Sequence, residues 1–407
     1  MNGAGKKNVA VLFGGRSVEH EISIITGLEV ISALDGQRYT AVPVYIDAQG
    51  RWWSGEVLLD RAFYKGLPDT YSQVREVALM PVPRVGGLTV LKSKGKAGFS
   101  LFGKGEEDII PVDVYFPVFH GQFGEDGCVQ GLFEMADVPY TGSGVLSSSV
   151  AMNKYVCKSV LHAHGIPVLP AAMVGKREVQ KNLDGVRARI LATKGLDDFP
   201  LFVKPVNLGS SIGVSKADNA AALDAGLAKV FQFDTEAIVE PCVVHKLEVN
   251  VSVLGGETPV ASVVEIPVAS GDVLSYEDKY MRGGSAKGKA GGSQRIQGMA
   301  GLTRVIDPED LDAGIKRAVT QHALDAYSTL GCGGVVRFDF MLDTDTNQLY
   351  FNELNPLPGS MAHYLWAKCK PPVIYTEMLS RIIAAAFERK EQQAGLKRDL
   401  GFKAMFA

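Results

Sequence analysis

The chain opens with a run of five apolar residues, 9–13, that ends at a pair of glycines. A run that is apolar on both faces is typical of a strand buried in a parallel sheet. Apolar residues then recur at helical spacing from Ile22 to Ile31, and we expect Ser17 to be the N-cap of this helix. Alternating apolar residues over 42–46 predict a second strand, so the chain begins with a right-handed β-α-β unit.

Strands and helices continue to alternate, which predicts an α/β protein whose C-terminal part is α+β. The glycine- and serine-rich stretch 141–149 marks a boundary, and we expect domains over residues 1–145, 146–243 and 244–407. Further strands are expected at 112–119, 200–203, 237–240, 246–254, 335–342 and 349–355, and helices at 151–165, 307–331 and 374–387.

Residues 270–299 interrupt this alternation, because they are polar and glycine-rich and show no periodicity. A loop of this length inside a compact chain is usually a functional lid or a disordered segment. We therefore expect a lid loop at 270–299. A second glycine- and lysine-rich stretch, 86–105, is typical of hairpin turns or of a mobile surface segment.

Composition narrows the class of protein. The 407 residues suffice for two or three domains at about 150 residues each, and 46% hydrophobic with 21% charged residues excludes a disordered or fibrous chain. A net charge of −3 without a basic block argues against nucleic acid or a membrane surface as partner. The five cysteines are scattered without a CxxC pair, and no signal peptide or run of ~18 apolar residues occurs. We expect a soluble, cytoplasmic protein with reduced thiols.

The hairpin predicted near the C-terminus carries the strongest chemical signal. Period-two alternation places Arg337 and Asp339 on one face of its first strand, and Glu353 and Asn355 on one face of its second. A turn centred near residue 346 would set Asp339 opposite Glu353. Two carboxylates and an amide oxygen suit Mg²⁺, which takes oxygen ligands together with substrate phosphates. The alternative is the exposed polar face of an edge hairpin; apolar residues on the other face favour the metal site, since buried carboxylates need a cation.

A glycine- and serine-rich loop, 207–214, follows Lys204 and contains the pair Ser210 and Ser211. Backbone N–H groups of such a loop can fold over phosphates while a lysine at the strand end meets their charge. A flexible surface turn explains this segment equally well when it is taken alone. Together with the carboxylate hairpin, it predicts a nucleotide–Mg²⁺ site.

Several other polar residues stand beside predicted elements, and each alone is more typical of a surface charge or a structural residue than of a site. A carboxylate in the first turn of a helix, such as Glu19, stabilises the helix dipole, and a histidine in a glycine-rich turn, such as His120, could orient a ligand. The other candidates are Lys154, Glu240 and Glu248.

Nearly the whole chain resembles one family, the D-alanine–D-alanine ligases of the ATP-grasp superfamily. Seven segments carry the resemblance and occur in the family's order. They are VAVLFGGRSVEHEIS (9–23), HGQFGEDGCVQG (120–131), MNKYVCK (152–158), FVKPVNLGSSIGVS (202–215), YEDKY (276–280), VRFDFM (336–341) and FNELNPLPG (351–359).

The resemblance implies an ATP-grasp fold, in which an N-terminal parallel α/β domain precedes two α+β domains that clasp ATP. It implies two Mg²⁺ ions, with Mn²⁺ as an alternative, bound by Asp339, Glu353 and Asn355. The implied ATP-binding residues are Lys154 and Lys204 at the phosphates, Glu240 and Glu248 at the adenine and ribose, and Ser210, Ser211 and Lys279.

The resemblance also implies how the amino-acid substrates are held. Glu19 would meet the amino group of the first D-amino acid, in a hydrogen-bonded set with Ser210 and Tyr280 that closes the lid. Arg337 would face the acyl phosphate and the developing oxyanion, with a backbone N–H from Gly359. The implied catalytic residues are Glu19, Ser210, Tyr280 and Arg337, and the implied substrate-binding residues are Glu19, His120, Arg337, Gly359 and Tyr364.

Two segments depart from the family pattern. Tyr364 stands where the family has a serine that helps to bind the carboxylate of the second amino acid, and Ala367 replaces a proline. The lid is several residues longer than usual after Tyr280, and residues 298–300 replace the family's Cys-Pro-Ala. These departures concern the acceptor side, whereas the ATP and first-substrate motifs are intact.

The sequence therefore predicts ATP-dependent ligation of two D-alanines through an acyl phosphate, for peptidoglycan synthesis. The alternatives are a ligase of the same mechanism with a different acceptor and, from another class, a nucleotide-binding regulator without activity. A D-lactate acceptor is disfavoured because Tyr280 matches the dipeptide-forming enzymes. The expected partners are ATP and D-amino acids, and the family implies a homodimer.

Overall fold

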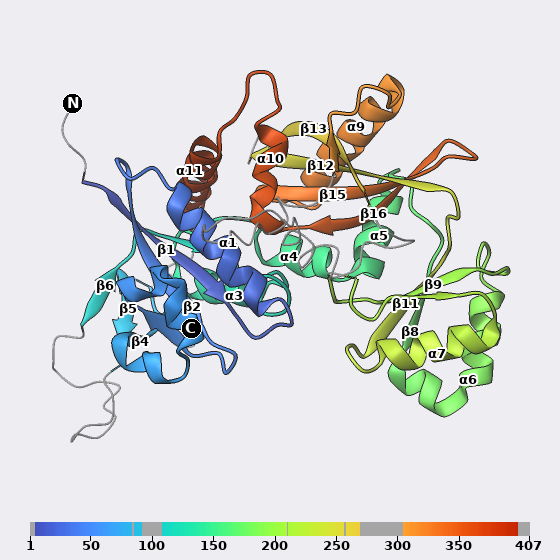
Figure 1. Cartoon of the computed structure of the whole chain (residues 1–407), viewed down its shortest axis with the longest axis horizontal. Coiled ribbons are helices and arrows are strands. Elements are labelled where there is room, and N and C mark those ends of the chain that lie inside the picture. The colour runs from blue at the N-terminus through green and yellow to red at the C-terminus, as the bar shows by residue number, and fades with distance from the viewer. Residues whose placement is uncertain are drawn as a thin grey trace, which may run out of the picture.

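The computed structural model describes residues 5–83, 85–91, 108–209, 211–255, 258–268 and 304–397. These residues form three β-sheets with helices packed against them (Figure 1). The sheets follow one another along the chain, which agrees with the expected α/β start and α+β continuation. None of the described helices is both long and apolar enough to cross a membrane.

The first sheet has seven strands in the order β6-β5-β4-β3-β2-β1-β7. Strand β1 lies parallel to β2 and to β7, as the opening β-α-β pattern predicts. The other neighbouring strands of this sheet pair antiparallel. Gly27 lets α1 approach β1 closely, because a Cβ there would lie 2.5 Å from the Phe13 side chain. The elements are β1 (Lys7–Gly14), α1 (His20–Ala33), β2 (Tyr39–Ile46), β3 (Trp52–Ser54), η1 (Glu56–Leu59), α2 (Arg61–Lys65), η2 (Asp69–Gln73), β4 (Arg75–Ala78), β5 (Gly87–Val90), β6 (Ile109–Pro111), β7 (Val114–Pro117) and α3 (Cys128–Ala136).

The second sheet has four antiparallel strands in the order β10-β9-β11-β8, with α6 and α7 on one face (Figure 1). Small aliphatic side chains from both helices and the sheet form its core. Its elements are β8 (Ala172–Gly175), α6 (Lys176–Leu191), β9 (Leu201–Pro205), β10 (Ser215–Ala217), α7 (Ala220–Val230) and β11 (Glu236–Pro241).

The third sheet has five antiparallel strands in the order β14-β13-β12-β15-β16. Helix α9 packs on β12 and β13, whereas α4 and α5 pack on β16, although they precede the second sheet in the chain. The elements are α4 (Val145–Met152), α5 (Lys154–Ala163), β12 (Lys246–Gly255), β13 (Val260–Pro267), β14 (Arg304–Ile306), α9 (Ala313–Thr329), β15 (Gly334–Asp343), β16 (Gln348–Asn355), η5 (Gly359–Ala362), α10 (His363–Trp366) and α11 (Tyr375–Ala394).

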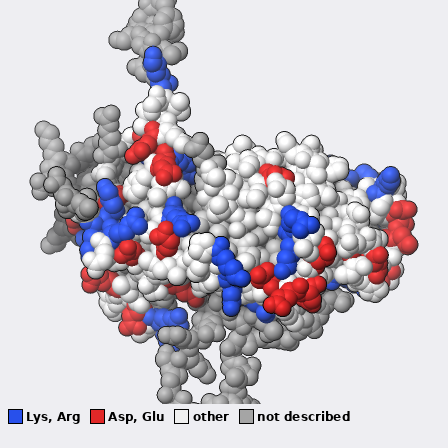
Figure 2. All heavy atoms as spheres, turned by 90° about the horizontal axis from the view of Figure 1, so that it is seen from above, with Lys and Arg blue, Asp and Glu red and all other residues white. Residues whose placement is uncertain are grey.

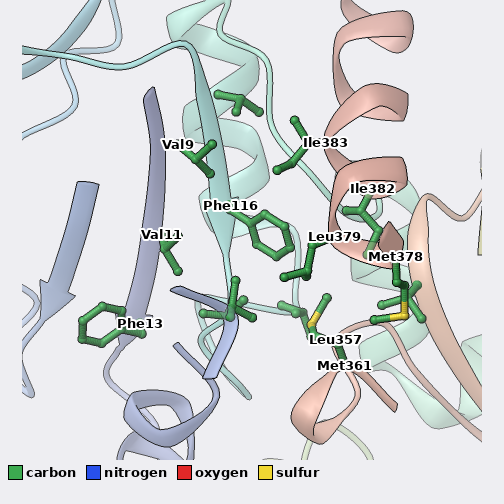
Figure 3. Close-up of a cluster of buried hydrophobic side chains, with 14 of the residues drawn as sticks. Val9, Val11, Phe13, Phe116, Leu357, Met361, Met378, Leu379, Ile382 and Ile383 are labelled. Carbon is green, nitrogen blue, oxygen red and sulfur yellow. The ribbon is translucent and has the colours of Figure 1, made fainter. Parts of the chain in front are cut away.

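The C-terminal helix α11 joins the first sheet to the third. Figure 3 shows its Met378, Leu379 and Ile382 facing Phe116 of β7, with Leu357 and Met361 beside them. All of these side chains are buried in one core that also contains apolar residues of β1. Because this core spans residues 9–386, the two sheets cannot move apart without exposing it.

Three expectations about helices are wrong in detail. The first helix begins at His20 rather than after Ser17. The Ser17 Oγ accepts from the Glu19 N–H over 3.2 Å and donates to the carbonyl oxygen of His120 over 2.7 Å. The helix expected from 307 begins at Ala313, because the Asp312 carboxylate accepts from the N–H groups of the first turn. The expected linker 141–149 and helix 151–165 are replaced by α4 and α5, which meet at Asn153.

Lysine and arginine side chains are interspersed with aspartate and glutamate over the face in Figure 2. Neither sign of charge covers that face alone. This mixture on one face accords with the small net charge of −3.

Candidate active site

A cavity lies between the second and third sheets and encloses about 1080 Å³, including its solvent-filled mouth. Its wall brings together residues that are far apart in the sequence. Those with polar side chains are Lys154, Lys204, Ser211, Lys246, Glu248, Asn250, Glu265, Arg304, Arg337, Asp339, Asn352 and Glu353.

One row of polar residues crosses four strands of the third sheet at this cavity. Glu265 on β13 pairs with Asn250 on β12, Asn250 pairs with Asp339 on β15, and Asp339 pairs with Glu353 on β16. Residues directly opposite each other in a sheet project from the same face. The three carboxylates and the amide therefore line one continuous wall.

The predicted pairing of Asp339 with Glu353 is confirmed, and a β-bulge produces it. Near the hairpin turn, Asp343 pairs with Gln348, a register that would set Asp339 opposite Asn352. The bulge between Asp339 and Phe340 shifts the register by one residue, so Glu353 takes the place opposite Asp339. Bulges commonly redirect side chains beside functional sites. Here Asn352 and Glu353, although adjacent, both line the cavity.

Arg337 holds Asp339 with two parallel hydrogen bonds of 2.7 Å from its Nε and Nη2 atoms. Asn355 also donates to Asp339, over 3.1 Å. Burial opposes the charge of Arg337, but Asp339 outweighs burial and raises the pKa of the guanidinium. Arg337 therefore remains a fixed cation beside the two carboxylates.

The donor set of this hairpin fits a hard divalent cation. Asp339 and Glu353 face each other with Asn355 alongside, and each offers only oxygen ligands to a cation. No three His, Cys, Asp or Glu side chains of the described ranges gather into a complete metal site. A pair of carboxylates is what Mg²⁺ uses when substrate phosphates complete its shell.

A cluster of three charged residues stands at the opposite wall of the cavity, with Glu240 and Lys158 buried and Lys204 partly buried. Glu240 of β11 accepts from Lys158 of α5 through Oε1, and from Lys204 of β9 through Oε2 over 2.7 Å. Burial alone would raise the pKa of Glu240, but the two lysine charges outweigh it and hold the pKa at about 2. Lys204 reaches the cavity and also donates to Asn352 of the third sheet over 3.3 Å.

The positions of Lys204 and Glu240 in this lysine–glutamate–lysine cluster can be compared with the ATP-binding roles expected for them. Lys204 lines the cavity as predicted, whereas Glu240 is fully buried and binds the two lysines rather than contributing to the wall. Burial lowers the pKa of Lys158, although Glu240 opposes that effect. Glu248 does line the cavity, where Lys246 donates to it over 2.8 Å.

The loop after Lys204 lies beside the start of α5. Lys154 donates to the carbonyl oxygen of Leu208 and lines both the large cavity and a smaller one next to it. Ser211 has a positive φ of 58° and lines the large cavity. Lys154 and Ser211 therefore lie where an ATP-binding role was expected for them.

Glu19 lies between two glycine turns that the sequence separates widely. A Cβ on Gly121 would lie 3.0 Å from Glu19 Oε2, and a Cβ on Gly209 would lie 3.7 Å from both carboxylate oxygens. The buried carboxylate of Glu19, at the start of α1, therefore lies beside the glycine–serine loop of the second sheet. The smaller cavity, lined by Gly121, Gly209 and Glu353, connects this position with the carboxylate hairpin.

His120 is buried, and its Nε2 lies 3.0 Å from Thr26 Oγ1. Burial lowers its pKa despite the nearby charge of Glu19, so the imidazole is neutral. The pKa of Glu125, in the same loop, shifts in the opposite direction. Burial and the charge of Glu19 raise it to about 8. The surroundings of Glu19 thus keep neighbouring groups uncharged.

The segment after the hairpin turns sharply at Gly359. Ser360, Met361 and Ala362 all have positive φ values of 49–52°, which non-glycine residues rarely adopt, and Ser360 Oγ donates to Glu29 Oε2 over 2.8 Å. This turn leads into α10, where Tyr364 donates through its hydroxyl to Glu265 over 3.0 Å. The hydroxyl of Tyr364, a substrate-binding residue that the resemblance implies, is thus bound to Glu265 in this structure.

Three of the expected site residues, Ser210, Lys279 and Tyr280, lie outside the described residues, as does the expected lid loop 270–299. The sequence analysis also missed residues that line or support the site. Lys158 had a signal, since it ends the MNKYVCK motif, and Asn352 precedes the expected Glu353. Glu265 and Arg304 had none, because only strand pairing brings them to the cavity.

The fold and the site define a class: an ATP-grasp ligase, with a polar cavity between two antiparallel sheets. Family models for the D-ala D-ala ligase N-terminus and C-terminus match residues 8–143 and 160–384. The chain therefore belongs to the D-alanine–D-alanine ligase family and is an ATP-dependent ligase.

Individual relatives agree along the full length. The chain is 37% identical over 400 residues to D-alanine–D-alanine ligase A of Bradyrhizobium diazoefficiens, with 97% of this chain and 99% of the relative covered. It is 34% identical over 393 residues to D-alanine–D-alanine ligase of Chloroherpeton thalassium, covering 95% and 98%.

Two solved structures share the fold. The D-alanine–D-alanine ligase of Coxiella burnetii superimposes with a TM-score of 0.73 at 27% identity, covering 96% of this chain and 97% of that one. A D-Ala:D-Ser ligase of Enterococcus faecalis also gives 0.73, at 26% identity, covering 94% and 100%.

Proposed function

We propose that this chain joins two molecules of D-alanine into D-alanyl-D-alanine for peptidoglycan synthesis, with conversion of ATP to ADP and phosphate. The single observation that carries the proposal is the cavity wall. It combines lysines for phosphates, a facing carboxylate pair for a metal, and an arginine beside that pair. Phosphoryl transfer depends mainly on such positioning and charge neutralisation.

ATP would occupy the large cavity, with its phosphates near Lys154, Lys204 and the loop of Ser211. Glu248 lines the same cavity and would bind the ribose. We assign Glu240 the role of holding Lys204 in place, because both of its carboxylate oxygens contact lysines. Asp339, Glu353 and Asn355 would hold two Mg²⁺ ions, or Mn²⁺, which when bound neutralise the charge on the phosphates.

The first D-alanine would bind near Glu19 and His120, with its ammonium group against the Glu19 carboxylate. Its carboxylate oxygen attacks the γ-phosphorus of ATP, ADP leaves, and an acyl phosphate forms. Activation of this kind is needed because a carboxylate itself resists attack by an amine. Ser210 and Tyr280 would close the site around this intermediate and keep water away.

The second D-alanine attacks the carbonyl carbon of the acyl phosphate through its neutral amine. Negative charge develops on the carbonyl oxygen, and the fixed cation Arg337 together with the Gly359 N–H would stabilise it. Inorganic phosphate leaves, the amine loses its extra proton, and the dipeptide remains.

We place the protein in the cytoplasm, where ATP is available, and propose a homodimer, as the family implies. Large apolar side chains that are exposed on helices, among them Met135 of α3 and Leu146 of α4, are candidates for the contact. The three domains proposed from the sequence, 1–145, 146–243 and 244–407, each contain one of the three sheets.

The experiment that tests the proposal measures ADP release from ATP with D-alanine and identifies the product by mass spectrometry. D-Serine and D-lactate, each supplied with D-alanine, serve as rival acceptors. We expect one ADP per D-alanyl-D-alanine. ATP turnover that yields only D-alanyl-D-serine or a depsipeptide would contradict the proposed substrate, and no turnover with any acceptor would contradict the enzymatic role.

A further inference from the structure

A second buried charged cluster lies at the β13–β14 end of the cavity. The carboxylate of Glu265 is almost fully buried; it accepts from the Tyr364 hydroxyl over 3.0 Å, from Arg304 Nη1 over 2.8 Å and from Asn250 Nδ2 over 3.3 Å. The guanidinium of Arg304 stacks on the Tyr364 ring, 3.9 Å from its centre. Burial, reinforced by the Glu265 charge, raises the pKa of Tyr364, so its hydroxyl keeps the proton that it donates.

This cluster belongs to the same wall as the reaction centre. Glu265 and Arg304 line the large cavity together with Arg337 and Asp339. Glu265 stands in the cross-strand row that ends at Glu353, and Arg304 is two residues from Ile306, the partner of Glu265 on β14. The charge of Glu265 also acts on Arg337, so the cluster adjoins the expected oxyanion site.

The arrangement fixes the orientation of Arg304. Glu265 binds one edge of the guanidinium and the Tyr364 ring covers one face, so the plane of the group is set before a ligand arrives. A guanidinium carries five N–H donors in a rigid plane and binds carboxylates in a planar, directional manner. A side chain held in this way is preorganised to receive a carboxylate that enters the cavity.

We propose that Arg304 binds the carboxylate of the second, acceptor amino acid, and that Tyr364 and Glu265 position Arg304 for this task. The inference rests on the proposed dipeptide synthesis and names the residue that selects its acceptor. Tyr364 occupies the position at which a serine hydroxyl was expected to bind that carboxylate, but its own hydroxyl is bound to Glu265. Arg304, stacked on its ring, takes over the role.

A competition experiment tests this assignment. The enzyme receives ATP, D-alanine as donor, and equal concentrations of D-alanine and D-alaninamide as acceptors, and mass spectrometry measures the ratio of the two products. D-Alaninamide has the attacking amine but lacks the carboxylate. Wild type should favour D-alanine by about 10²-fold or more, since a site built to bind a polar group strongly rejects an analogue that lacks it.

Arg304→Met should reduce this preference at least about tenfold, because both acceptors then lack a charged partner. Arg304→Lys, which keeps the charge but loses the planar stack, should give an intermediate ratio and serves as the reporter if the methionine variant does not fold. Arg189→Met, which removes an exposed partner of Glu178 far from the cavity, is the matched control and should leave the ratio unchanged.

The product ratio distinguishes a failure of the Arg304 assignment from a failure of the proposed function. If neither Arg304 variant alters the ratio while both slow the two products equally, Arg304 is structural and the inference is overturned. If wild type forms dipeptide with no preference between the two acceptors, no residue recognises the carboxylate and the inference also fails. If wild type forms neither product, the proposed function fails, and the assignment of Arg304 fails with it.

Discussion

The two ends of the cavity each contain a buried glutamate that holds basic residues, but the two clusters differ in purpose and origin. On the nucleotide side, Glu240 binds Lys158 and Lys204, and both lysines lie within motifs that the family shares. On the acceptor side, Glu265 binds Arg304 and Tyr364, and Tyr364 departs from the family pattern.

The difference indicates that the reaction constrains the residues on the two sides of the cavity to different degrees. Phosphoryl transfer from ATP requires neutralisation of the triphosphate charge, and Glu240 holds Lys204 of β9 and Lys158 of α5 beside the proposed phosphate site. The acceptor needs only a carboxylate partner and a pocket of suitable size, which several combinations of residues can supply. The planar arginine stacked on an aromatic ring is one such combination, and it is more directional than a lysine ammonium.

The largest effect should come from the residue between the two clusters. Glu353→Gln removes a charge from the carboxylate pair that a metal requires, while the amide keeps the size of the side chain. We expect turnover to fall at least about 10³-fold, since metal-bound phosphate must be neutralised for transfer. Steady-state ADP release measures the effect, and circular dichroism checks the fold. Exposed Glu309→Gln is the control; activity above a tenth of wild type would refute the metal site.

Lys204→Ala, on the nucleotide side, should reduce the reaction rate more than any single substitution on the acceptor side. Loss of a fixed counter-charge at a phosphate costs about 2.7–4 kcal/mol in the transition state, or 10²- to 10³-fold in rate. The comparison requires kcat and the KM of ATP and of both D-alanine sites. Unchanged ATP binding and rate would remove Lys204 from the phosphate site.

Lys158→Met tests whether the lysine–glutamate–lysine cluster stabilises the fold. The charge of Glu240 would then be shared with one lysine only, and removal of one member of a buried ion pair costs about 3 kcal/mol of unfolding free energy. Urea unfolding measures this loss. Arg381→Met, in an exposed ion pair on α11, should change stability by less than about 1 kcal/mol. Equal effects of the two substitutions would show that the buried cluster adds no stability.

Tyr364→Phe should have the smallest effect, because it keeps the ring under Arg304 and removes only the hydroxyl donor to Glu265. We expect the kcat/KM of the acceptor to fall about tenfold, near 1.4 kcal/mol, with the KM of ATP unchanged. Tyr375→Phe is the matched control, since the buried Tyr375 hydroxyl has no hydrogen-bond partner among the described residues. A rise in the KM of ATP would place Tyr364 on the nucleotide side.

Much of the architecture could be predicted from periodicity alone. Strands form near the expected positions at the apolar run 9–13, the alternation at 42–46 and the final hairpin. They could be predicted because the local pattern of apolar residues shows whether one or both faces of a strand are buried. Helix starts were less predictable. Ser17 is a good N-cap by type, yet in the structure its hydroxyl binds the distant His120 carbonyl, a contact that no local pattern encodes.

The sequence by itself determined the family, the nucleotide motifs and the hairpin that carries Asp339 and Glu353, because these depend on residue type and on spacing within short segments. Only the tertiary structure decided that Glu240 holds two lysines and that Arg304 and Glu265 reach the cavity. The physical reason is that strand register and side-chain ion pairs join residues tens to hundreds of positions apart. The bulge in β16 and the pairing of β13 with β14 place charges that no spacing along the chain reveals.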